Sequence, residues 1–109
     1  MNARLNDRPT DLEVMRREEQ RLALLRWLHA LPTYTANEEL ARLYLTAVGL
    51  VADRADLRGR LKELGDADLL TVRMEGPLMV ITLTRRGGDV AQGVTSVEGV
   101  RRPGPECPY

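Results

Sequence analysis

The chain lacks several residue types and patterns that whole classes of protein require. Among its 109 residues are one cysteine, no phenylalanine, one tryptophan and three tyrosines. A single cysteine, Cys107, can form neither an internal disulfide nor a thiolate metal cage. Because aromatic residues are so few, the hydrophobic core must be built from aliphatic side chains. No apolar run approaches the roughly 18–20 residues that a membrane span needs. The N-terminal residues contain no apolar segment typical of a secretory signal, so the cytosol is the expected compartment.

The chain also lacks an excess of charge of either sign. Its 16 lysines and arginines balance 16 aspartates and glutamates. Proteins that depend on phosphate contacts usually carry a basic excess, because the release of counterions from phosphates drives much of their affinity. Any contact with DNA must therefore depend on where the basic side chains lie rather than on net charge.

The sequence contains no recognisable set of catalytic or metal-binding residues. No Ser-His-Asp combination, phosphate-binding loop, dinucleotide fingerprint or metal-ligand spacing is present. The only histidine, His29, falls near the end of a predicted helix, where a basic residue is favourable, and a structural role is expected for it. The adjacent acids Glu18-Glu19 and Glu38-Glu39 would point about 100° apart on a helix, which is unsuitable for a shared general acid and base. We therefore expect no enzymatic activity, no cofactor and no metal site.

What the sequence does contain is a succession of helical patterns with start and stop signals. Thr10 and Glu13 have the spacing of a capping box, which predicts a helix from Asp11 to about Leu31. Pro32 then ends this helix. The first half of the helix is highly charged, and the second half carries an apolar stripe at helical spacing. The stripe consists of Leu22, Leu25, Leu28 and Leu31.

Two shorter helices follow. One is expected over 37–48, capped by Thr35 or Asn37, and the other over 53–65, capped by Asp53. Both show apolar residues at helical spacing. The residues expected to face the core are Leu40, Leu43, Tyr44 and Ala47 in the first of these helices and Leu57, Leu61 and Leu64 in the second.

The second half of the chain has the pattern of a β-hairpin. Two runs rich in β-branched residues, 69–75 and 78–84, are separated by the turn signal Gly76-Pro77 and favour antiparallel pairing. Residues 84–93 can form one or two weak helical turns, and glycine and proline accumulate after them. The expected organisation is a flexible arm at 1–9, one domain at 10–93, and an extended or disordered tail at 94–109.

This order of elements is that of a winged helix-turn-helix, a mainly α fold with a small β-hairpin. The three helices bury their apolar stripes against one another, and the hairpin covers the open edge of that core. In this fold, the third helix would be the recognition helix and the hairpin would be the wing.

Two stretches carry a resemblance to a known family. They are LRGRLKELGDADLLTV (57–72) and LTRRGGDVAQGVTSVEGVRRPGP (83–105). They resemble the small winged-helix proteins of Mu-like prophages, often labelled regulators of the ArsR type, and the resemblance covers about residues 20–105. It implies a phage origin and therefore the cytosol of a bacterial host. Asp68 stands where a glycine normally precedes the first wing strand. The clustered cysteines of arsenic sensors are absent, so no sensing site carries over.

Basic residues in the third helix and the hairpin are the candidate DNA-binding residues. Arg54, Arg58 and Lys62 recur every four residues and would form one stripe. Such a stripe can place cationic groups at guanine edges and at phosphates, and residues of the hairpin can reach neighbouring phosphates. The predicted DNA-binding residues are Arg54, Arg58, Arg60 and Lys62 on the helix, and Arg73, Arg85 and Arg86 on and after the hairpin.

The same segment supports a second interpretation. Residues 51–65 carry four basic and three acidic side chains, which can pair to form an ordinary salt-bridged exterior. Leu12 and Met15 precede the core stripe, and we predict them as a dimer contact; two-fold pairing would help a neutral module to bind DNA. The sequence thus predicts a regulator of transcription that binds double-stranded DNA as a homodimer. The alternative is a non-enzymatic accessory module that contacts a phage or host protein, for example in packaging or at a polymerase.

Overall fold

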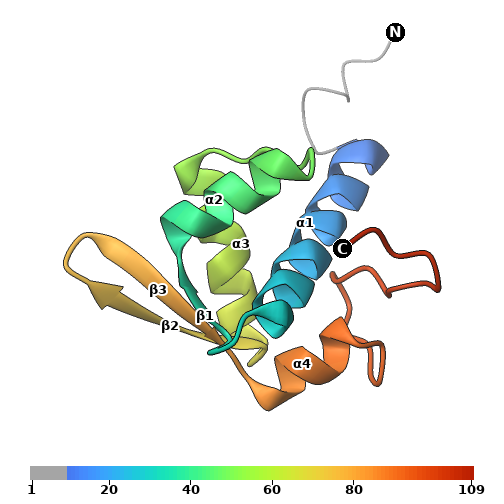
Figure 1. Ribbon diagram of the computed structural model, residues 1–109. Coiled ribbons are helices and arrows are strands. Elements are labelled where there is room, and N and C mark those ends of the chain that lie inside the picture. Colours follow the sequence, from blue (N-terminus) through green and yellow to red (C-terminus); the bar gives the residue numbers. More distant parts are fainter. Residues whose placement is uncertain (1–9) are drawn as a thin grey trace, which may run out of the picture.

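The computed structural model describes residues 10–109, which form four helices and three strands (Figure 1). The strands make one antiparallel sheet in the order β1-β3-β2. This α+β architecture is compatible with a winged helix-turn-helix. The predicted arm at 1–9 lies outside the described residues. The elements are α1 (Asp11–Ala30), β1 (Thr35–Asn37), α2 (Glu38–Ala47), α3 (Arg54–Asp66), β2 (Leu70–Glu75), β3 (Leu78–Leu83) and α4 (Arg85–Ala91).

The first three helices begin at side chains that cap their free backbone N–H groups. Each cap accepts a hydrogen bond from the N–H three residues further on, at 2.8 to 3.1 Å. Of the two residues that the sequence offered as the cap of α2, Asn37 takes this role, while Thr35 begins β1. The caps are Thr10 for α1, Asn37 for α2 and Asp53 for α3.

The core is aliphatic, as the composition predicts. The predicted stripes of α1 and α3 are buried almost completely, apart from Leu31, which is only partly buried. The Trp27 indole lies at the edge of this core and stacks on the Tyr44 ring, with 5.1 Å between the ring centroids. The leucines with at most 1% exposure in these stripes are Leu22, Leu25, Leu28, Leu57, Leu61 and Leu64.

The orientation of α2 differs from the prediction. Leu40 and Leu43 are 51% and 49% exposed, and Ala47 is exposed as well, so these residues face outward rather than into the core. Tyr44 is half-buried. The opposite side of the helix faces the core through Glu38, Ala41 and Leu45.

A long-range ion pair accompanies this orientation. Both stripes of α2 have helical spacing, and the leucines favoured the wrong one because the residues that bind Glu38 lie far from it in the sequence. In the fold, the buried Glu38 carboxylate meets Arg58 of α3 and the backbone N–H of Met79 in β3.

The hairpin of β2 and β3 projects from the helical body (Figure 1). Its register runs from Leu70 opposite Leu83 to Glu75 opposite Leu78. Gly76 in the turn has a φ of +60°, which a glycine adopts without strain. On its other side, β3 pairs with the short strand β1, for which no strand was predicted above.

The last helix, α4, packs against α1, and at Gly87 it also comes very close to the backbone just before β2. A Cβ atom at Gly87 would lie 1.9 Å from the carbonyl oxygen of Leu69, so no larger residue fits there without moving the backbone. The seven residues of α4 therefore form a packed helix, although a pair of glycines makes the segment intrinsically weak.

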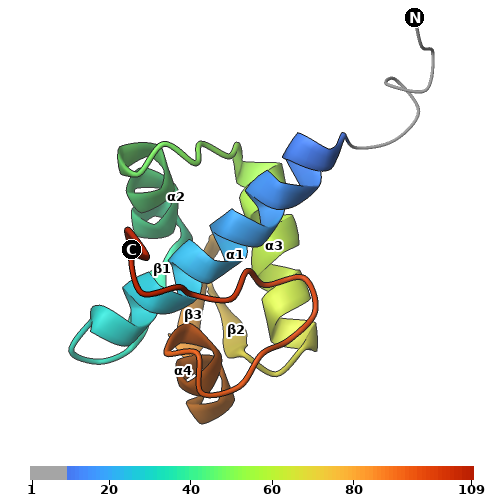
Figure 2. The same cartoon turned by 90° about the vertical axis from the view of Figure 1, so that its right-hand side faces the viewer.

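Residues 94–109, here called the C-terminal strap, have no regular secondary structure and lie across α1 (Figure 2). The Arg21 guanidinium donates to the carbonyl oxygen of Gly99 at 2.8 Å, and Arg26 donates to that of Tyr109 at 2.9 Å. The Tyr109 hydroxyl donates to Glu19 at 3.0 Å. Burial and the neighbouring Glu19 carboxylate raise the pKa of Tyr109 to about 12. The strap is thus extended and bonded to α1 along its length.

Candidate functional site

Arg58, the central residue of the predicted DNA-binding stripe, is held by other parts of the protein. Its guanidinium donates to both carboxylate oxygens of Glu38, each at 2.7 Å, and to the carbonyl oxygen of Pro77 at 3.0 Å. Only 30% of its side chain is exposed. Arg58 therefore joins α3 to the start of α2 and to the turn of the hairpin.

Glu38 is the buried partner in this arrangement, with 2% of its side chain exposed. It also accepts a hydrogen bond from the Met79 backbone N–H at 2.7 Å, and the Arg54 Nε lies 3.9 Å from its carboxylate. The hydrogen bonds from Arg58 outweigh the effect of burial and, with help from Met79, lower the pKa of Glu38 to about 2. Glu38 is therefore ionised at neutral pH and is neutralised by Arg58.

Arg60 does not flank an exposed stripe as predicted, because it is 9% exposed. Its Nε donates to Glu63 at 2.8 Å, and Arg21 of α1 bonds to the same carboxylate at 2.9 Å. Burial opposes ionisation of Glu63, but the two arginines outweigh it and lower the pKa of Glu63. Arg60 thus helps to fasten α3 to α1, and it is not positioned for a groove contact.

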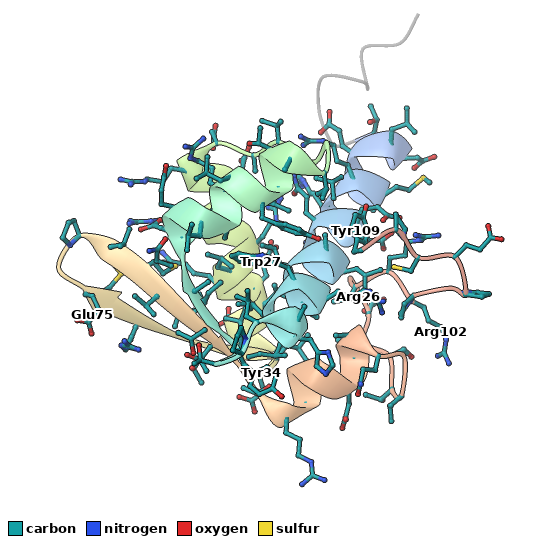
Figure 3. All side chains as sticks on the ribbon, viewed as in Figure 1. Arg26, Trp27, Tyr34, Glu75, Arg102 and Tyr109 are labelled. Atoms are coloured by element: carbon teal, nitrogen blue, oxygen red, sulfur yellow. The ribbon has the colours of Figure 1, made fainter. Side chains whose placement is uncertain are left out.

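Arg73, on β2, pairs with Glu75 at 3.0 Å, and both side chains are about 60% exposed. Glu75 lies at the far end of the hairpin in Figure 3. An exposed ion pair of this kind contributes little to stability and breaks readily, so Arg73 can still contact another molecule.

The four remaining predicted cations are exposed. Arg54 has 61% of its side chain exposed, and no ion pair within residues 10–109 involves Lys62, Arg85 or Arg86. Of these, Lys62 has the exposed acid Asp66 one helical turn after it on the same side of α3. The structure therefore does not gather the seven cations into one basic surface.

An apolar surface that the sequence analysis missed lies on the outer face of α2, defined here as Leu40, Leu43 and Ala47. An ion pair between Glu39 and Arg42 at 2.7 Å borders this face and keeps the border electrically neutral. The spacing of Leu40, Leu43 and Ala47 was visible in the sequence, but it was interpreted as the buried side of the helix.

Exposed apolar residues continue beyond α2. Val51, in the loop after α2, is 54% exposed, and the Arg16 guanidinium donates to its carbonyl oxygen. This bond places the first turns of α1 beside that loop. Leu12 and Met15 in these turns are 76% and 56% exposed, so they are accessible for the predicted dimer contact, which stays a prediction.

The described residues offer little else for chemistry. Within residues 10–109, no three His, Cys, Asp or Glu side chains lie close enough together to hold a metal ion. No helix of the described part has both the length and the apolarity to cross a membrane. Cys107 is a partly buried free thiol in the C-terminal strap.

Comparison with known proteins places the chain in a phage family. No family model matches the chain, and no solved structure matches it. It is 40% identical over 90 residues to a protein of Escherichia phage Mu named "uncharacterized protein gp26". The match covers 83% of this chain and 93% of the phage Mu protein. The chain therefore belongs to the gp26 family of Mu-like phages.

Proposed function

We propose that the chain is a winged helix-turn-helix module of Mu-like phages that contacts another protein through the outer face of α2. The succession of three helices and a projecting hairpin supports the winged-helix assignment. Recognition of DNA bases by α3 is the less favoured use of this fold, because the Arg58 guanidinium is already bound to Glu38 within the protein.

The bidentate bond between Arg58 and Glu38 carries this proposal. To reach a base edge, Arg58 would have to leave a carboxylate that is 2% exposed. Separating a buried pair and leaving one charge uncompensated costs about 3–5 kcal/mol. A good bidentate contact to a base contributes about 1–3 kcal/mol. The internal bond is therefore the stronger of the two, and Arg58 stays where it is.

The outer face of α2 has the composition of a docking surface. Burying a whole leucine side chain stabilises by about 1.5–3 kcal/mol, so burying the exposed halves of Leu40 and Leu43 contributes about 1 kcal/mol each. The stripe repeats at i, i+3 and i+7, which suits an amphipathic helix laid alongside it. Because the Glu39–Arg42 border is neutral, the expected partner is a helix with an apolar face and little net charge.

A photo-crosslinking experiment during phage growth tests the proposal. A benzophenone-bearing residue at position 43 is expected to give a protein adduct of one defined mass, and a Leu40→Asp substitution in the same chain should suppress that adduct. The same crosslinker at Lys62 on α3 is the matched control and should give no adduct. A phage encoding Leu43→Asp should also yield fewer particles than one encoding Thr46→Asp, which adds the same charge beside the stripe.

The opposite pattern would contradict the proposal. Crosslinks to DNA from position 62, together with none from position 43, would assign the contact to α3. Unchanged phage yield with Leu43→Asp would show that the outer face of α2 is not used.

A regulator that binds double-stranded DNA is the second candidate, and the exposed cations favour it. Arg54, Lys62, Arg85 and Arg86 can still contact phosphates, and pairing through Leu12 and Met15 would double their number. Binding of this kind would depend strongly on salt and little on sequence. Lys62→Ala should then weaken binding to all duplexes alike, and Met15→Asp should convert a dimer into a monomer in light scattering.

A further inference from the structure

The strand β2 is an open edge of the sheet. It pairs with β3 on one side only, because the strand order is β1-β3-β2. Residues 71–75 of β2 are all exposed, and the strand lies on the outer side of the hairpin in Figure 1. An edge of this kind presents backbone N–H and carbonyl groups to which another strand can bond.

The pairing with β3 determines which backbone groups of β2 point outward. The Thr84 N–H donates to the Leu69 carbonyl oxygen at 3.2 Å, so these two residues form a bonded pair at the base of the hairpin. Bonded pairs recur at every second residue of an antiparallel ladder, so residues 71, 73 and 75 bond to β3. The N–H and carbonyl groups of Val72 and Met74 therefore point away from β3, and they have no other backbone partner within residues 10–109.

The accessible part of this edge is the half of β2 that lies toward the turn. At its first residue the strand is close to α3, since a Cβ atom at Gly65 would lie 3.9 Å from the Leu70 carbonyl oxygen. Further along, the side chains of Val72 and Met74 are 37% and 49% exposed. The turn itself is held by α3, which donates a hydrogen bond to the Pro77 carbonyl oxygen. The outer half of β2 is thus both open and fixed in position.

Two charges of opposite sign lie on the other face of this half of β2. Arg73 and Glu75 bind each other at 3.0 Å, and both are exposed, so they can change partners at little cost. A neighbouring strand matches them if it carries an acid opposite Arg73 and a base opposite Glu75. A second copy of β2 meets this requirement, because an antiparallel strand runs in the reverse direction. When the two copies are centred on Met74, Arg73 of each copy lies opposite Glu75 of the other.

This register is the only one of the three possible ones that pairs both charges. Residues whose backbone groups point outward must face each other, so the two-fold axis passes through residue 72, 73 or 74. An axis at Arg73 sets two arginines directly opposite each other, which is destabilising. An axis at Val72 sets Arg73 opposite Thr71 and moves the turn of each copy toward α3 of the other. An axis at Met74 avoids both faults.

We propose that two copies of the chain pair through the open edges of β2, antiparallel and centred on Met74, so that their sheets become continuous. On one face, Val72 and Met74 of both copies cover one another. On the other face, the two Arg73–Glu75 pairs lie at non-hydrogen-bonded positions, where opposite side chains approach most closely. The outer face of α2 stays free, so this pairing does not depend on the proposed function.

The dimer is expected to be weak because the overlap is short. Contacts that bury less than about 1,200 Å² in total are typical of transient complexes. We expect half of the chains to be paired at a concentration of about 0.1–1 mM.

Sedimentation equilibrium of the whole chain up to about 1 mM tests the pairing. Arg73→Glu and Glu75→Arg should each be monomeric, because like charges then face each other. An equimolar mixture of the two variants should form a dimer again, since each acid of one chain meets a base of the other. The double variant Arg73→Glu/Glu75→Arg should also dimerise. A purely internal role of the Arg73–Glu75 pair would not give rescue by mixing.

A cysteine crosslink locates the axis, in a chain whose own thiol is removed by Cys107→Ser. Met74→Cys should give a disulfide-linked dimer on mild oxidation. Thr71→Cys, exposed on the same strand, is the matched control and should stay monomeric, because the two copies of residue 71 lie far apart in this register.

The proposal is overturned if the chain stays monomeric at about 1 mM, or if mixing the two charge variants does not restore the dimer. Equal crosslinking through positions 71 and 74 would also overturn it. Met15→Asp and Leu43→Asp should leave the dimer unchanged. A dimer that is lost in Met15→Asp but kept in Arg73→Glu would assign the contact to α1, and one lost only in Leu43→Asp would assign it to α2.

Discussion

Replacing Glu38 by glutamine should destabilise the fold strongly, because it removes the charge that Arg58 neutralises. The Arg58 hydrogen bonds, acting against burial, lower the pKa of Glu38 from 4.5 to about 2. At 1.36 kcal/mol per pKa unit, this difference corresponds to roughly 3 kcal/mol of stabilisation at neutral pH. Arg58 is 30% exposed and can recover some hydration when its partner is lost. We therefore expect Glu38→Gln to lower the free energy of unfolding by about 2–4 kcal/mol.

The assay is urea unfolding of the parent and of two variants at pH 7. Glu39→Gln is the matched control, because Glu39 is adjacent in sequence but belongs to an exposed pair with Arg42 and should contribute little to stability. The pH dependence gives a second check. A carboxylate with a depressed pKa in the folded state stabilises above pH 4.5, and this stabilisation is lost as the pH falls toward 2.

The difference between the parent and Glu38→Gln should therefore shrink below pH 4.5. Two outcomes would refute the reasoning: equal effects of the Glu38 and Glu39 substitutions, or a Glu38→Gln effect that does not change with pH. Either would mean that Arg58 is not held by Glu38 and is available for other contacts.

Two further substitutions test the packing of α4 and of the C-terminal strap. Gly87→Ala places a methyl group against the Leu69 carbonyl oxygen and should lower stability by about 1–3 kcal/mol or more, measured by thermal unfolding; an unchanged melting temperature would show that α4 does not pack as described. Tyr109→Phe removes the hydrogen bond to Glu19 and should lower stability by about 1 kcal/mol while exposing the strap to faster proteolysis; a strap cleaved at the same rate in both proteins would mean that the bond does not hold it.

The sequence was informative wherever local chemistry decides the structure. The caps at Thr10 and Asp53 and the turn at Gly76 depend on groups within a few residues of each other, so they could be predicted. Asp68 adopts the left-handed conformation, with φ of +65°, that a residue replacing a turn glycine needs. The leucine stripe of α3 was unambiguous, because no competing stripe exists on that helix.

The sequence was misleading wherever a distant partner decides the structure. The inward side of α2 depends on Glu38, whose partner Arg58 is 20 residues away. Leucine spacing alone could not indicate that a charged residue would be buried instead of Leu40 and Leu43. The bond to Glu38 also withdraws Arg58 from the predicted DNA-binding stripe.

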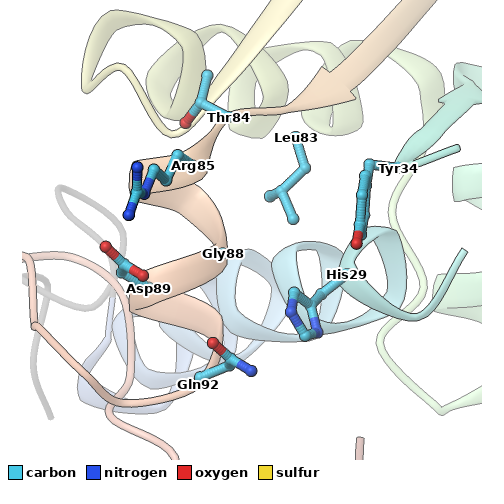
Figure 4. A pocket seen from close by; sticks show the side chains of 8 residues that line it. All are labelled: His29, Tyr34, Leu83, Thr84, Arg85, Gly88, Asp89 and Gln92. Atoms are coloured by element: carbon cyan, nitrogen blue, oxygen red, sulfur yellow. The ribbon is translucent and has the colours of Figure 1, made fainter.

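A hollow of about 270 Å³, lined by His29, Tyr34 and Gly88, also depends on contacts that no local pattern encodes (Figure 4). Tyr34 and Gly88 are brought together only when α4 packs against α1, so the hollow could not be identified from the sequence. His29 was expected to have a structural role at the end of α1, and its ring lies 6.1 Å from the Tyr34 ring, measured between the centroids. The spacing of Arg85 and Asp89 on α4 was visible, but the helix itself was predicted to be weak.

The measurement that tests the central claim most directly is a titration of the chain with a random-sequence DNA duplex at about 50 mM and 200 mM salt. If Arg58 and Arg60 stay bound to internal carboxylates and the outer face of α2 contacts protein, binding should be weak at both concentrations and should hardly change between them. Lys62→Ala should then have no effect. Tight binding that falls steeply with salt and is lost in Lys62→Ala would contradict the account and establish α3 as a DNA-binding helix.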